Sequence, residues 1–227
     1  MSGIGLLNEN SLHASLKEWY AQPGAQFEVL VDGYVIDIVQ DDLLLEIQTS
    51  SFASIKTKLS NLLPSHQIRL IYPIAAEKWI IRLMEDSTDE MSRRKSPKRG
   101  RVEDLFYEMV RFPWLLANPN FSLEVLMIKE EEVRRFKGKR LWRSRGWGIE
   151  GRRLLEVTDR KLFHNPEDWR DLLPEKLGTS FTTGDLAETS GISKPLAQKM
   201  TYCLRKVKMI DFKGKKGRFN LYEIAGN

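Results

Sequence analysis

The stretch from Tyr34 to Thr49, which reads YVIDIVQDDLLLEIQT, consists of two apolar runs that flank a polar turn. This pattern is typical of a β-hairpin whose strands are largely buried. Each run nevertheless contains one acid, Asp37 in the first and Glu46 in the second, and Gln48 follows two residues later. Because an unpaired buried carboxylate is costly, these polar residues need partners that the hairpin alone does not supply.

If residues 41–42 form a two-residue loop, Asp37 lies directly opposite Glu46 across the hairpin. Directly opposed side chains have Cβ atoms about 5 Å apart, and alternation places Gln48 on the same face as Glu46. A loop shifted by one residue at one end would change this opposition. The predicted register leaves the other face apolar, with side chains fit for a core: Ile36, Ile38, Leu43, Leu45 and Ile47.

Two carboxylates at this separation suit Mg²⁺ (or Mn²⁺), which takes one or two carboxylates and completes its shell with water and phosphate oxygens. Such a metal polarises a phosphate and generates a hydroxide nucleophile. The alternative is that Asp37 and Glu46 lie on a solvated face of the hairpin. The run DLLLEIQ argues against this alternative, because its first half is apolar on both sides, as in a central strand.

Composition places the chain among globular proteins with one large domain or two small ones, since it has 227 residues. Its net charge of +5 invites a polyanionic partner such as DNA. The one cysteine, Cys203, excludes an intrachain disulfide and a cysteine-based zinc site, and it fits a reducing cytoplasm. No apolar run approaches the roughly 18 residues of a membrane span, and the N-terminus lacks the features of a signal peptide.

We therefore expect a cytoplasmic protein with no membrane partner. The sequence leaves the oligomeric state open, a homodimer included. The three histidines, His13, His66 and His164, are isolated and show no nucleophile or metal spacing.

Residues 1–84 read as a mixed α/β layer with a mainly antiparallel start. A helix capped by Asn8 or Asn10 is expected to run to about Tyr20. The remaining elements, in order, are a strand at 27–31, the hairpin, a helix at 51–63 and strands at 67–72 and 78–84.

Residues 85–164 begin with a composition shift, an expected exposed basic loop. Between residues 93 and 101 it carries six basic residues and no acid: Arg93, Arg94, Lys95, Lys98, Arg99 and Arg101. This loop would either clamp DNA beside the acidic site or serve as a linker. A helix at 102–116 and a strand at 121–128 follow, and the charged stretch 130–145 reads as a strand pair or as a helix with a basic loop.

Residues 165–227 have the element order of a winged helix-turn-helix. Thr182 is expected to cap a short helix, and Ser193 a longer one with Pro195 in its first turn. Two strands at 210–212 and 219–224 then flank the basic turn KGKKGR.

This module offers residues for nucleic-acid contact. Nine basic residues and one acid lie between Lys194 and Arg218, and phosphate contacts of this kind give affinity rather than sequence readout. The candidates are Lys194, Gln198 and Lys199 on the second helix, and Lys213, Lys215, Lys216 and Arg218 on the wing. Winged helices also serve as protein-interaction modules, so that alternative stays open.

The hairpin motif resembles the PD-(D/E)XK nuclease superfamily, in Ile36-Asp37 and in Glu46-Ile47-Gln48. The resemblance covers roughly residues 8–84. It implies a core of helix, three strands, helix and strand, with a metal held by Asp37, Glu46 and the Ile47 carbonyl. It also implies a role for Glu9 in the first helix, where resolvase-type members carry a glutamate.

The sequence departs from the superfamily pattern at Gln48, where lysine is usual, although some restriction endonucleases use glutamine there. Lys56 on the following helix is a candidate migrated substitute. Lys58 lies about 200° around that helix from Lys56, so only one of the two lysines can face the site.

The sequence thus predicts a restriction-endonuclease-like α/β core at 1–84, an extension at 85–164 and a winged-helix domain at 165–227. The expected function is that of an Mg²⁺-dependent DNA endonuclease recruited by the winged helix. The alternative is a non-catalytic DNA-binding regulator or adaptor with an inactive nuclease-like core.

Overall fold

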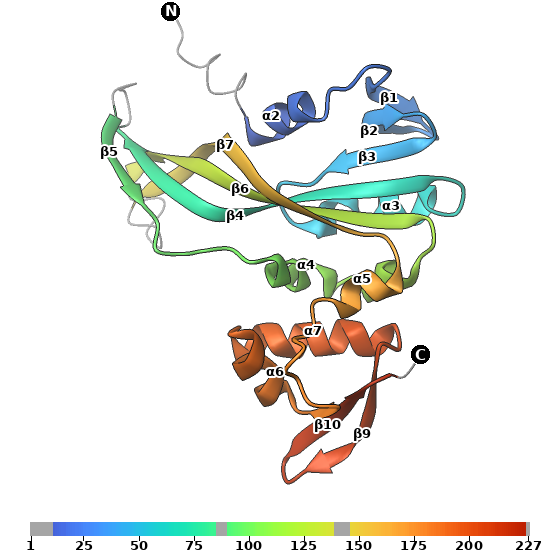
Figure 1. Ribbon diagram of the computed structural model, residues 1–227. Helices are drawn as coiled ribbons and strands as arrows, with labels where there is room; N and C mark the ends of the chain where they lie inside the picture. Colours follow the sequence, from blue (N-terminus) through green and yellow to red (C-terminus); the bar gives the residue numbers. More distant parts are fainter. Residues whose placement is uncertain (1–10, 85–89, 139–145, 226–227) are drawn as a thin grey trace, which may run out of the picture.

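A computed structural model describes residues 11–84, 90–138 and 146–225. The larger part is a mixed sheet of seven strands with order β1-β2-β3-β4-β6-β7, to which β5 adds by pairing with β4 (Figure 1). Its strands are β1 (Gln26–Val31), β2 (Tyr34–Gln40), β3 (Leu43–Ile47), β4 (Gln67–Leu83), β5 (Glu90–Lys95), β6 (Phe121–Phe136) and β7 (Trp147–Phe163).

The hairpin of β2 and β3 has the predicted register. Gln40 pairs with Leu43 and Ile38 with Leu45, and the regular ladder ends there. Asp41 in the turn adopts a φ of +52°, a conformation that Asp tolerates better than most residues. Asp37 and Glu46 therefore lie just beyond the last paired residues of the two strands.

The apolar residues of this hairpin are buried as expected, but they divide between two clusters. Ile38, Leu45 and Ile47 pack with Leu12 and Leu16 of α2 (Leu12–Trp19), on one face of the sheet. Ile36 and Leu44 belong to the cluster on the other face, which is covered by α3 (Lys56–Leu62), α4 (Phe106–Met109) and α5 (Pro166–Arg170) (Figure 1).

The first described helix begins later than predicted. Ser11, rather than Asn8 or Asn10, caps α2, because its hydroxyl accepts the backbone N–H of Ala14 at 3.2 Å. Asn8 and Asn10 lie outside the described residues.

Two predicted strands, at 67–72 and 78–84, are one continuous strand, β4, which has an irregularity in its pairing between Ala75 and Glu77. Pro73 lies between the two predicted strands. The strand tolerates this proline because β3 ends opposite Ile71, so among the described strands Pro73 pairs with β6 alone. Beyond β3, the strands β4 and β6 continue side by side to Leu83 and Arg135.

The segment after β4 differs from the prediction in two places. Arg93, Arg94 and Lys95 form part of β5 instead of a loop, since a fully exposed edge strand needs no apolar pattern. The helix expected at 102–116 is broken into η2 (Val102–Leu105), α4 and η3 (Pro113–Ala117), the last starting at a proline.

The middle of the chain belongs to the same sheet as its N-terminal part. Over the described part of residues 130–145 the chain is strand rather than helix, but it is the end of β6 alone, and the antiparallel partner β7 begins at Trp147, beyond the predicted stretch. Since β6 also pairs along its length with β4, the sheet continues across residue 84 without a gap.

The C-terminal part is built from α6 (Thr183–Ser190), α7 (Lys194–Lys206) and a small antiparallel sheet. The order of that sheet is β8-β10-β9, from β8 (Ser180–Phe181), β9 (Ile210–Lys216) and β10 (Phe219–Ile224). The caps Thr182 and Ser193 are confirmed by their hydrogen bonds to Asp185 N–H and Leu196 N–H. None of the helices in the described residues has the length and apolar character needed to cross a membrane.

One buried cluster joins the C-terminal part to the large sheet. Figure 1 shows α7 directly beneath α4 and α5, and the cluster runs from Leu59 of α3 through Trp169 of α5 to Met200 of α7. Trp169 is 2% exposed, and its ring stacks on that of Phe163 at 4.4 Å between centroids.

We expect Trp169→Ala to lower the free energy of unfolding by about 3–5 kcal/mol, because it empties the stacked position between α5 and β7. Urea unfolding followed by circular dichroism measures the change. The matched variant Trp114→Ala removes a tryptophan that is 42% exposed and should cost about 1 kcal/mol or less. Equal losses of unfolding free energy for the two variants would contradict the importance of Trp169 for the cluster that joins the C-terminal part to the large sheet.

Candidate functional site

The two acids of the hairpin meet where β2 and β3 separate. Glu46 Oε1 accepts the backbone N–H of Asp37 at 3.3 Å, and Asp37 Oδ2 accepts the backbone N–H of Ile47 at 2.9 Å. Each carboxylate thus occupies a place where a backbone carbonyl would continue the ladder. This reciprocal arrangement satisfies both N–H groups and fixes the two carboxylates beside each other.

Helix α2 supplies cationic partners for Asp37. Lys17 Nζ lies 3.4 Å from Oδ1, and His13 Nε2 lies 3.1 Å from Oδ2. The two residues are four apart and so project from one face of the helix. Burial raises the pKa of Asp37, but the hydrogen bonds from His13 and Ile47 N–H, with the charge of Lys17, outweigh burial and hold that pKa below its usual value.

Helix α3 supplies the partner for Glu46, which is 5% exposed. Lys58 Nζ contacts Glu46 Oε1 and also donates to the carbonyl of Val35. Burial is the main cause that raises the pKa of Glu46 above its usual value; the hydrogen bond and charge of Lys58 oppose the rise, and Asp37 adds to it.

Of the two lysines considered for the site, the structure places Lys58 there and Lys56 elsewhere. The ammonium of Lys56 lies 5.9 Å from the ring centroid of Phe112. The turn before α3, η1 (Phe52–Ile55), is a 3₁₀ helix, whose tighter winding shifts the direction of every following side chain. A periodicity extrapolated from Phe52 therefore could not identify which lysine faces the hairpin.

Gln48 follows the pair but does not face it. Its amide nitrogen lies within hydrogen-bonding distance of Ser50 Oγ (2.9 Å), Ser51 O (2.7 Å) and Ser54 Oγ (3.0 Å). Its backbone N–H donates to Ile71 O at 2.9 Å. Gln48 therefore ties the loop between β3 and η1, and the nearest cation to Glu46 comes from Lys58.

The same loop has a second anchor that the sequence did not reveal. Glu108 Oε2 of α4 accepts the Ser51 hydroxyl at 2.9 Å and the Phe52 N–H at 3.0 Å. His13 was also missed as a site residue, because it reads as isolated. The available signal was its i, i+4 spacing from Lys17. Glu9, predicted to contribute from the first helix, lies outside the described residues.

For a metal, the described residues offer two carboxylates and no larger group. No cluster of three or more His, Cys, Asp and Glu side chains suited to a metal occurs in the part of the chain that the structure describes. The pair of Asp37 and Glu46 fits Mg²⁺, which needs only one or two carboxylates. Lys17 lies against Asp37 and Lys58 against Glu46, so the electrostatic potential between the two acids is negative.

The basic residues that could have clamped DNA beside the acids are spread along β4, and those on β5 lie at its far end. Arg93 pairs with Ile81 of β4, whereas Ile47 pairs with Ile71, which separates the two places by roughly 30 Å along β4. Several of these cations have acidic partners. Arg93 contacts Glu131, Lys95 and Arg99 contact Glu77, and Arg101 contacts Glu103. Arg94 is exposed on β5, and Lys98 lies in the segment that follows β5.

The C-terminal candidates are exposed and partly gathered. Lys194 and Gln198 of α7 and Lys216 of β9 line one concavity of about 850 Å³. Lys199 is half-buried, and Lys213, Lys215 and Arg218 are exposed on the β9–β10 hairpin, with Lys213 2.6 Å from Glu223. The turn before α7 contacts the segment between β5 and α4, because Arg101 donates to Gly191 O at 3.1 Å.

Opposite pH dependences are expected for the two acids. The lowered pKa of Asp37 stabilises the fold above the unfolded-state value of about 3.9, and this is lost as pH falls. The raised pKa of Glu46 stabilises the fold below about 4.3, and this is lost as pH rises. The stability difference between wild type and Asp37→Asn should therefore grow with pH below about pH 5 and stay level above it, and that between wild type and Glu46→Gln should shrink with pH above about pH 4. Urea unfolding measures both, and slopes of equal sign would contradict the assignment.

The chain is similar to a protein family and to a relative of known sequence. The profile of the family described as "Domain of unknown function (DUF8091)" matches residues 10–164, which include both acids, Lys58 and the whole large sheet. An "Uncharacterized protein" of Treponema pallidum (strain Nichols) is 33% identical over 221 residues, which cover 96% of this chain and 86% of that protein. No solved structure matches. The chain therefore belongs to the family described as "Domain of unknown function (DUF8091)".

Proposed function

We propose that this protein is a metal-dependent DNA endonuclease of the PD-(D/E)XK type. The observation that carries the proposal is the meeting of Asp37 and Glu46 where β2 and β3 separate, with Lys58 against Glu46. The element order from α2 to β4 is helix, three strands, helix and strand, the order that the resemblance implies. The relevant lysine would come from α3 in place of the usual position at Gln48.

Each residue of the site has a role that its geometry supports. Asp37 and Glu46 would hold Mg²⁺ or Mn²⁺, which, when bound, supplies a polarised phosphodiester and an activated water. Lys58 would stabilise the negative charge that develops on the phosphate oxygens. His13 and Lys17 orient the Asp37 carboxylate from the side of α2.

Recruitment of DNA is proposed for residues 165–227, acting as a winged helix-turn-helix. The outer stripe of α7 exposes Lys194, Gln198 and Tyr202, while its inner side belongs to the buried cluster that it shares with α4 and α5. The β9–β10 hairpin would act as the wing, with Lys215, Lys216 and Arg218 exposed at its tip. These side chains would contact phosphates and contribute affinity that depends on salt.

A second candidate is a non-catalytic DNA-binding regulator or adaptor, and a specific observation favours it. Gln48 is engaged with the serines of its own loop. In addition, both carboxylates already have cationic side chains as partners. Such a closed site would need no metal for its stability, and the C-terminal part would then carry the function.

We expect Asp37→Ala and Glu46→Ala to abolish Mg²⁺-dependent cleavage of plasmid, single-stranded or branched DNA while leaving DNA binding intact. Lys58→Met should lower the cleavage rate by about 100-fold or more, since it removes a cation that stabilises developing charge. Lys56→Met is the matched control and should leave the rate near wild type.

Undiminished cleavage by both acid variants would contradict the assignment of Asp37 and Glu46 to the site. Binding without cleavage of any substrate by the wild type would favour the second candidate.

The wing can be tested by salt dependence. Replacing Lys215, Lys216 and Arg218 with alanine should weaken DNA binding and flatten the plot of log affinity against log salt, by about one unit for each phosphate that the wing no longer neutralises. Fluorescence anisotropy with a labelled duplex at several salt concentrations measures both quantities. The control removes three other exposed lysines, Lys56, Lys137 and Lys176. If both triple variants behave alike, the wing does not bind DNA; negligible affinity of the wild type at physiological salt would indicate a protein-interaction module instead.

A further inference from the structure

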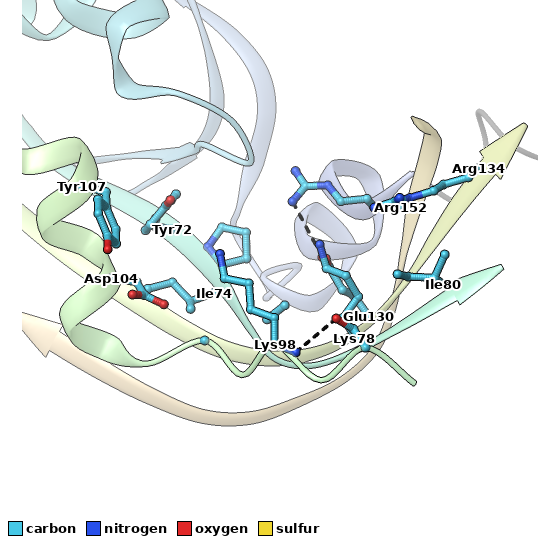
Figure 2. A pocket seen from close by; sticks show the side chains of 14 residues that line it. Tyr72, Ile74, Lys78, Ile80, Lys98, Asp104, Tyr107, Glu130, Arg134 and Arg152 are labelled. Carbon is cyan, nitrogen blue, oxygen red and sulfur yellow. Dashed lines mark hydrogen bonds and ion pairs between the residues drawn. The ribbon is translucent and has the colours of Figure 1, made fainter. Parts of the chain in front are cut away.

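A pocket lies beyond the end of β3, on the face of β4, β6 and β7 that α4 also covers. Its volume is about 590 Å³, which is within the range of small-molecule sites. Its floor comes from β4 and β6, and one wall is the segment from Ser96 to Tyr107. Figure 2 shows Tyr72, Tyr107 and Asp104 at one end, Arg134 and Arg152 at the other, and Lys98 between them.

The charges that line this pocket favour an anion. Four cations face two acids there, namely Lys78, Lys98, Arg134 and Arg152 against Asp104 and Glu130. The aromatic end adds apolar area, because Pro73 and Ile74 lie beside the two tyrosines. Burial raises the pKa of Tyr72 to about 12, so its hydroxyl stays neutral and can donate a hydrogen bond.

Two buried acids of β6 hold these cations in place. Glu130 is 1% exposed and lies 2.9 Å from Lys78 Nζ and 3.7 Å from Arg152 Nη1. Glu132 is 4% exposed and lies 2.7 Å from Lys78 Nζ and 2.5 Å from Arg134 Nη2.

Fold stability alone is a poor reason for this network. Buried ion pairs are often no more stabilising than apolar packing of similar volume, because each charge loses its hydration. Here the buried acids instead position guanidinium and ammonium groups at the wall of an open pocket. Guanidinium forks match phosphate geometry, and aromatic faces suit a planar ring.

We propose that this pocket binds a nucleoside phosphate. The ring would lie against Tyr72 and Tyr107, and the phosphate would contact Lys98, Arg134 and Arg152. The ligand has two sources with this chemistry, a free nucleotide or one nucleotide of a bound DNA strand. Binding of a nucleotide within a DNA strand rests on the proposed function, whereas binding of a free nucleotide does not.

Two residues of the pocket also contact the loop that follows β3. Arg152 donates to the carbonyl of Thr49, the residue after Gln48. Tyr72 packs edge-on against Phe52 in the following turn, at 4.8 Å between ring centroids. A phosphate that engages Arg152 therefore acts on the same loop that Gln48 and Glu108 hold.

The test measures binding in buffer with EDTA, so its result does not depend on cleavage. Full-length protein is titrated by calorimetry with the common ribo- and deoxyribonucleoside mono- and triphosphates. A short deoxyoligonucleotide, with and without a 5′-phosphate, is titrated in the same way. We expect Lys98→Glu and Tyr107→Ala each to weaken binding by about 10-fold or more, since the first removes a charge-assisted hydrogen bond and the second a stacked ring. Both side chains are exposed, and unchanged thermal unfolding without ligand shows that the variants fold.

The charge-matched control is Lys176→Glu, at an exposed position outside the pocket. Weakened binding of free nucleotides by the pocket variants but not the control identifies a free nucleotide as the ligand. Weakened binding of the oligonucleotide alone, again with an unaffected control, identifies a strand nucleotide. The proposal is overturned if no nucleotide binds and oligonucleotide binding is unchanged in the pocket variants. It is equally overturned if the control weakens binding as much as they do.

Discussion

The structure depends on two carboxylates that replace backbone carbonyls at the point where β2 and β3 separate. Asp37 and Glu46 each accept an N–H from the opposite strand. Without them, both strands would carry buried N–H groups that lack acceptors, which costs about as much as breaking a hydrogen bond. The same carboxylates attract Lys17 and Lys58 from helices on opposite faces of the sheet. One pair of acids therefore holds three layers together and also concentrates negative potential at the edge of the core.

The second half of the large sheet uses charge differently. Past β3, the strands β4, β6 and β7 continue as a ribbon that buries Glu130 and Glu132 under basic side chains. These acids have cations at their sides rather than backbone N–H groups, and the cations face a pocket. The hairpin site and the pocket meet at the loop from Gln48 to Ser54, which Gln48, Arg152 and Glu108 hold from three directions. The proposed functions of the two sites thus share one structural element.

Local rules account for what could be predicted from the sequence. The hairpin register follows from turn length and alternation, and the caps at Thr182 and Ser193 follow from side-chain acceptors. The failures come from long-range context. The strand β4 was predicted as two strands, because the continuous pairing of residues 67–83 with β6 depends on a distant part of the chain, and β5 lacks an apolar pattern because it is an exposed edge. The pocket joins Tyr72, Lys98, Glu130 and Arg152, which are far apart in sequence and carry no shared motif.

A crystal structure of the protein soaked with Mn²⁺, with anomalous scattering recorded, tests most directly whether the two carboxylates form a metal site. The account predicts an anomalous peak between the carboxylates of Asp37 and Glu46, with the Lys58 ammonium displaced from the oxygen that the metal takes. If Lys58 stays on Glu46 and no peak appears between the acids at millimolar Mn²⁺, the metal site and the endonuclease built on it are contradicted.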